Sequence, residues 1–84
     1  MKLRFRVESV LADRGIVFAR PLDTGELKLS KHSTLGVRPV RHFDVPRKLR
    51  EDGTLDLELI SFFLRNPADA AHFPVGAIVV YADE

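Results

Sequence analysis

The stretch Lys2-Leu3-Arg4-Phe5-Arg6-Val7-Glu8 decides the fold, because apolar residues at 3, 5 and 7 alternate with charged residues. An extended backbone sends successive side chains to opposite faces, so this alternation predicts a strand with one buried and one solvated face. We expect the strand to continue to Val10 or Leu11. The same kind of pattern recurs along the chain and indicates an all-β protein.

Turns and strands alternate over the first thirty residues. Residues 12–15 end in Gly15, which accepts the positive φ of a turn. Residues 16–20 are β-branched and aromatic and predict the returning strand, and a second turn at 22–25 precedes another alternating segment at 26–29. We therefore expect a three-stranded meander here.

The middle of the chain predicts loops around two strands. Residues 30–36 are polar and predict a loop, and residues 44–53 predict a solvated one. Residues 37–43 predict an irregular edge strand, because Pro39 cannot donate to a central ladder. Residues 54–64 first alternate and then become apolar on both faces, which is typical of a long strand that enters a barrel.

The last twenty residues predict a helical turn and a final strand. Asn66 is suited to cap a helix, Pro67 to open it and Asp69 to occupy its first turn, with an end near His72. The apolar run 77–82 predicts a buried strand. The fold we expect is a small, closed or partly open, six-stranded antiparallel β-barrel with one short helical turn.

The chain of 84 residues predicts a single domain, residues 1–84, with 45% hydrophobic and 30% charged residues. It has no cysteine, which excludes disulfide scaffolds, thiolate zinc sites and thiol nucleophiles. Its apolar runs are too short to span a bilayer, and residues 1–6 lack the core of a signal peptide. We expect a soluble cytoplasmic protein with no membrane partner.

The charges are unevenly distributed. Residues 1–50 carry a net charge of +7, and residues 51–84 carry −6. Such a basic half is typical of a nucleic-acid partner. In the alternative interpretation, the two halves interleave in the barrel and their charges pair across strands.

The middle third holds the densest cluster of cations. Each cation on a phosphate releases counterions, and an exposed aromatic ring stacks on a base, so this cluster predicts a nucleic-acid site. The predicted contacts are Arg38, Arg41, Arg47, Lys48 and Arg50, with Phe43 as the stacking ring, and Arg4 and Arg6 as an extension of the cluster. The alternative is a solvated basic loop that pairs with Glu51, Asp52, Asp56 and Glu58.

Catalytic and metal-binding patterns are missing from the sequence. His42 and Asp44 would share one side of a strand, but a metal needs three or four converging ligands. No serine lies in a nucleophile motif, and no G-x-x-x-x-G-K-[ST] run is present to hold phosphates. We expect no metal, no cofactor, no GTP binding and no enzymatic activity. Phe62 and Phe63 are expected in the core.

Four pieces of the sequence resemble domain 2, the β-barrel, of the translational GTPases of the elongation factor Tu type. They are Val7-Glu8-Ser9-Val10, then Arg14-Gly15 separated by nine residues from Gly25, then Leu27-Lys28-Leu29, and the closing Phe63-Leu64-Arg65 with Val75-Gly76-Ala77-Ile78-Val79. Barrels of this family contact RNA, the ribosome and neighbouring domains. The resemblance implies a stand-alone barrel with such partners.

The resemblance also carries one residue of a binding pocket. Glu8 matches the acidic residue of the pocket that helps to hold the aminoacylated 3′ end of tRNA. Ala19 stands where the family has a small hydroxyl residue, Ser9 where it often has a second acid, and Ser30-Lys31 where it usually has Gly-Asp. We expect a stand-alone, non-catalytic module that contacts RNA or the translation machinery; the alternative is a protein-interaction or scaffold domain of the same fold that binds no nucleic acid.

Overall fold

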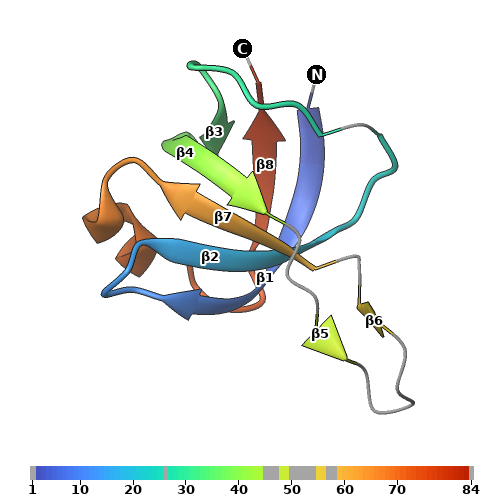
Figure 1. The fold of residues 1–84 in the computed structure, drawn as a ribbon, viewed down its shortest axis with the longest axis horizontal. Helices are drawn as coiled ribbons and strands as arrows, with labels where there is room; N and C mark the ends of the chain where they lie inside the picture. The colour runs from blue at the N-terminus through green and yellow to red at the C-terminus, as the bar shows by residue number, and fades with distance from the viewer. Residues whose placement is uncertain (1, 26, 45–47, 50–54, 57–58, 84) are drawn as a thin grey trace.

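The computed structural model describes residues 2–25, 27–44, 48–49, 55–56 and 59–83 (Figure 1). Six strands of this part form a closed antiparallel barrel in the order β1-β2-β7-β4-β3-β8, and β5 pairs with β6 in a separate two-stranded sheet. The predicted fold class is confirmed. In chain order the elements are β1 (Lys2–Leu11), β2 (Ile16–Pro21), β3 (Thr34–Leu35), β4 (Arg38–Asp44), β5 (Lys48–Leu49), β6 (Leu55–Asp56), β7 (Ile60–Leu64), the 3-10 helix η1 (Pro67–His72) and β8 (Ile78–Ala82).

The opening alternation forms the longest described strand. In β1 the side chains of Leu3, Phe5 and Val7 are buried, and the charged residues between them are exposed. The ring of Phe5 meets that of Phe62 on β7 edge to face, with centroids 5.0 Å apart. The buried side chains of β1, β2, β7 and β8 thus fill the barrel, as the alternation predicts.

The β1–β2 hairpin depends on a glycine. Gly15 has a φ of 67°, and a Cβ there would lie 2.5 Å from the Cα of Pro67. This position therefore needs both the left-handed backbone and the missing side chain of glycine. The contact also fixes η1 against the hairpin. As predicted, Asn66 caps η1, since its side chain accepts from the backbone N–H of Ala68 at 3.2 Å.

The expected three-stranded meander is wrong, because residues 27–29 form no strand. β1 pairs with β2 on one side and β8 on the other, and the second edge of β2 is taken by β7. No edge of this hairpin remains for a third consecutive strand. Instead, the Tyr81 hydroxyl donates to the Lys28 carbonyl at 2.5 Å, and Leu27 packs partly against the core.

Other boundaries in the middle of the chain also differ from prediction. The expected loop 30–36 contains β3, and the expected loop 44–53 contains β5. β4 is an interior strand, paired with both β3 and β7. Pro39 has no N–H to donate, but its carbonyl accepts from the N–H of Arg65, which lies beyond the end of β7. At this end of β7 the pairing therefore continues through one of the two possible backbone bonds.

The long strand expected over 54–64 is two elements. β6 ends at Asp56 and pairs with β5, whereas β7 begins at Ile60 and pairs with β2 and β4. The half-polar beginning of this segment and its apolar end therefore belong to different sheets. Figure 1 shows the β5–β6 ribbon projecting from the barrel.

Candidate functional site

Two cations of the predicted nucleic-acid site, Arg38 and Arg41, lie on β4, and each contacts another side chain. Arg38 is half-buried and donates to Asp69 of η1 at 3.3 Å. Arg41 is exposed, and its guanidinium carbon lies 5.8 Å from the centroid of the Phe63 ring. Exposed His42 lies beside the same ring, at a centroid distance of 5.7 Å. Arg38 therefore joins β4 to η1, and Arg41 lies over an aromatic ring while it stays exposed.

The predicted stacking ring, Phe43, faces inward. It is partly buried, and its centroid lies 6.5 Å from that of Phe62 and 6.3 Å from that of Tyr81. On β7 the ring that faces outward is Phe63, which is paired with His42. The expectation that both Phe62 and Phe63 lie in the core therefore holds for Phe62, whereas Phe63 is only partly buried.

The rest of the predicted basic stretch lies on or beside β5. Arg47 and Arg50 lie outside the described residues. Lys48 stands directly opposite Asp56 in the β5–β6 register. At this position the acidic half of the chain therefore lies beside the basic half.

The cations of β1 do not extend the cluster on β4. In the closed barrel two strands lie between β1 and β4 in either direction, so their outer faces point to opposite sides. Glu8, the residue matched to the tRNA pocket, accepts from the Arg20 Nε at 2.8 Å. Arg4 donates to Asp23 at 2.8 Å and, through its side-chain and backbone bonds, lowers the pKa of that carboxyl to about 2.

Metal and membrane sites find no support in the part of the chain that the structure describes. Among those residues no group of three or more His, Asp or Glu side chains is placed to hold a metal ion. No helix within the described ranges is long and apolar enough to cross a membrane.

The prediction of a buried last strand holds for only one face of β8. Tyr81 is buried, but Ile78 and Val80 on the other face of β8 are 57% and 40% exposed. η1 packs mainly on β7, β1 and β2, and Ile78 and Val80 stay exposed on this outer face. Two large aliphatic side chains therefore face solvent in the middle of the sheet.

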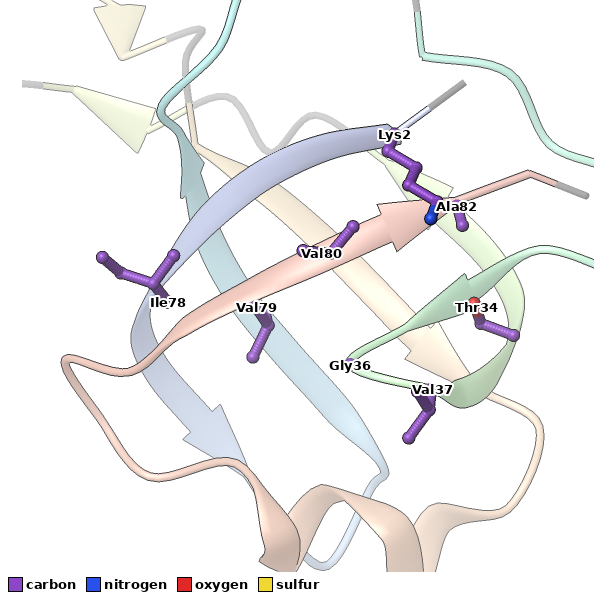
Figure 2. Close-up of a pocket in the computed structure, with 8 residues that line it drawn as sticks. All are labelled: Lys2, Thr34, Gly36, Val37, Ile78, Val79, Val80 and Ala82. Atoms are coloured by element: carbon purple, nitrogen blue, oxygen red, sulfur yellow. The ribbon is translucent and has the colours of Figure 1, made fainter.

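This face of β8 borders a hollow of about 550 Å³, which we call the β8 hollow. It lies between β8 and the β3–β4 turn (Figure 2). Its lining is mainly apolar, with one hydroxyl from Thr34 and one cation from Lys2. The lining residues are Lys2, Thr34, Gly36, Val37, Ile78, Val79, Val80 and Ala82.

The β3–β4 turn forms one wall of the β8 hollow and is strained. Leu35 pairs with Arg38, so the turn consists of Gly36 and Val37, with φ of 53° and 63°. Two left-handed residues suit the twist of a two-residue hairpin, but this conformation costs a β-branched residue about 1–2 kcal/mol. Val37 is also 86% exposed. A strained aliphatic side chain held out in solvent is more often functional than structural.

A row of cations runs beside the hollow. The β1–β8 register places Lys2 opposite Ala82, Arg4 opposite Val80 and Arg6 opposite Ile78. Directly opposed residues share one face of a sheet, so the outer face of these two strands carries a basic row beside an apolar row. The local sequence did not reveal this site, because residues 77–82 have the apolar composition of a buried strand. The strand pairing alone shows which side of β8 is covered.

Comparison with known proteins adds no information on function, so function is inferred from this geometry. No protein-family model matches the chain, and neither a curated protein nor a solved structure matches it. The resemblance to domain 2 of the translational GTPases stays a prediction.

Proposed function

We propose that this barrel is a non-catalytic protein-interaction module that binds a partner segment in the β8 hollow. The observation that carries the proposal is the gathering of three exposed aliphatic side chains, Val37, Ile78 and Val80, around one hollow. Exposed apolar surface of this kind is costly in water and is typical of a protein-binding site. The strain at Val37 supports the same interpretation, since it keeps one of these side chains exposed.

The distribution of charge favours a protein partner over a nucleic acid. A nucleic-acid site needs several cations that reach phosphates from one face. The described cations of β1 and β4 face opposite sides, and Arg4, Arg20 and Arg38 are held by carboxylates. The β8 hollow offers one cation, one hydroxyl residue and otherwise apolar groups, which suits a side chain of a protein.

Selection from a displayed random-peptide library tests this proposal. We expect peptides that bind the protein and lose binding to a Val80→Lys variant. The matched control is Leu11→Lys, because Leu11 is 42% exposed, against 40% for Val80, and does not line the hollow. Both variants must keep the thermal unfolding midpoint of the parent within a few degrees. A library that yields no peptide sensitive to Val80→Lys contradicts the proposal.

RNA is the second candidate partner, as the resemblance to the translation-factor barrel suggests. The supporting observation is the outer face of β4, where exposed Arg41 and His42 lie beside the half-buried ring of Phe63. A cation and an aromatic ring side by side suit a phosphate and a stacked base.

Fluorescence anisotropy with a labelled single-stranded RNA and a tRNA-like hairpin, at two salt concentrations, tests this candidate. Binding that falls steeply with salt and is weakened by Arg41→Gln supports it, with Arg14→Gln as the control on a distant turn. Equal binding by both variants, or no binding at low salt, contradicts an RNA site on β4.

A further inference from the structure

We infer that the segment bound by the β8 hollow is acidic: it places an aliphatic side chain in the hollow and carboxylates on Lys2 and Arg6. This inference rests on the proposed function and adds the chemistry of the partner. It depends on the charges beside the hollow, which the proposed function does not require.

The charged side chains of β1 differ in whether another described residue already pairs with them. Arg4 is occupied, because three side-chain hydrogen bonds of 2.8–3.3 Å join its guanidinium to Asp23. Glu8, further along the strand, is held by Arg20. Among the described residues neither Lys2 nor Arg6 has an ion pair, and both are exposed. Two cations without a counter-charge therefore flank the apolar row of β8.

The positions of these two cations match the ends of that row. Lys2 lies opposite Ala82 and also lines the hollow, whereas Arg6 lies opposite Ile78. The two residues are four apart on one strand, which corresponds to about 13 Å. An extended partner segment spans the same distance between residues i and i+4, and residue i+2 then points to the same face. A Glu-x-Leu-x-Glu segment therefore presents both carboxylates and the aliphatic side chain together.

On the side away from β1, the hollow is bordered by the β3–β4 turn (Figure 2). The side chains of Val79 and Val37 stand on either side of Gly36, below the end of β3. A Cβ at Gly36 would lie 3.2 Å from Phe73 and 3.4 Å from Val79. A larger residue at this position would therefore crowd this wall of the hollow. β3 pairs only with Tyr81 and Ala82 of β8, which leaves Ile78 and Val79 beside the hollow rather than beside a third strand.

Two synthetic peptides that differ only in charge test the inference. One is capped and centred on Glu-Thr-Leu-Thr-Glu, and the other on Gln-Thr-Leu-Thr-Gln. The readout is the amide chemical shifts of the isotope-labelled protein during titration. We expect the acidic peptide to shift the amides of Ile78–Ala82, Gly36 and Val37, and to bind about 2- to 30-fold more tightly than its neutral counterpart, as two exposed ion pairs allow.

Charge-removing variants identify the cations responsible. Lys2→Gln with Arg6→Gln is expected to abolish the preference for the acidic peptide, whereas the control pair Arg14→Gln with Lys28→Gln, which removes the same charge elsewhere, is expected to keep it. Substitution of the central Leu by Ser in the acidic peptide is expected to abolish the shifts at β8. High salt should reduce the preference as well.

The outcomes separate this inference from the proposed function. If both peptides shift the β8 amides with equal affinity, the partner is not selected by charge, and the inference is overturned while the proposed function stands. If neither peptide shifts them although library peptides bind at Val80, the inference again fails alone. If the library also yields nothing at Val80, both fail.

Discussion

The strained turn at Gly36-Val37 allows stability and binding to be separated by one substitution. Val37 has a φ of 63° and is 86% exposed, so its side chain contributes little to the fold and strains the backbone. Asparagine tolerates the left-handed conformation better than any β-branched residue. We therefore predict that Val37→Asn stabilises the protein and weakens binding of peptides in the β8 hollow.

Two opposing contributions set the change in the free energy of unfolding that we expect for Val37→Asn. Release from the left-handed strain of valine contributes about 1–2 kcal/mol. About one seventh of the Val37 side chain is buried, so its removal costs roughly 0.2–0.4 kcal/mol of the 1.5–3 kcal/mol for full burial. The net expectation is a stabilisation of about 0.5–1.5 kcal/mol, and each 1 kcal/mol raises the unfolding midpoint of a domain this small by about 4–8 °C.

Calorimetry and urea unfolding measure the gain, and peptide titration measures the loss. Val37→Ile is the matched control, because it keeps the branched Cβ and the apolar surface, and it is expected to change neither property much. Val37→Gly should give a smaller gain than Val37→Asn, since glycine adds entropy to the unfolded chain. An unchanged or lower unfolding midpoint for Val37→Asn would refute the argument from strain.

Three further predictions concern the barrel that holds the site. Gly15→Ala is expected to cost about 2–5 kcal/mol in urea unfolding, from a Cβ pressed against Pro67 and a φ of 67°, whereas Gly76→Ala, with a φ of 89° and open space around it, should cost only about 1–2 kcal/mol. The Asp23 carboxyl should titrate near pH 2 by NMR and return toward its usual pKa of 3.8 in Arg4→Gln. Because folding lowers this pKa, the contribution of the pair to stability is complete above pH 3.8 and is lost as the pH falls toward 2. If the stability of Asp23→Asn depends on acid pH in the same way as that of the parent protein, this explanation is contradicted. Tyr81→Phe removes the hydroxyl that donates to Lys28 and is expected to cost about 1 kcal/mol, with the loop at residues 27–30 exchanging its amides faster.

Several elements were predictable because their signals are local. The alternation of Leu3, Phe5 and Val7 required no partner to be recognised, and it defines the core face of β1 as observed. The turn at Gly15 and the helix cap at Asn66-Pro67 each depend on residues only a few positions away. The first hairpin and η1 therefore lie where the sequence predicts them. These features sufficed for the fold class.

The errors arose where the structure depends on strand pairing. Residues 27–29 alternate like a strand but find no open edge, and Tyr81 from a distant part of the chain holds them instead. The apolar run of β8 looked buried on both faces, but the barrel covers only one. The β8 hollow combines Lys2, Val37 and Val80 from three separate segments. No spacing along the sequence indicates that these residues meet.

The most direct test of the account is chemical-shift mapping of one labelled sample with two ligands, the acidic peptide and a single-stranded RNA. The account predicts that the peptide shifts the amides around Ile78–Ala82 and the Gly36-Val37 turn, and that RNA leaves these amides unchanged. Shifts by the peptide that are absent from β8, or RNA shifts centred on the β8 hollow, would contradict the claim that this face binds protein.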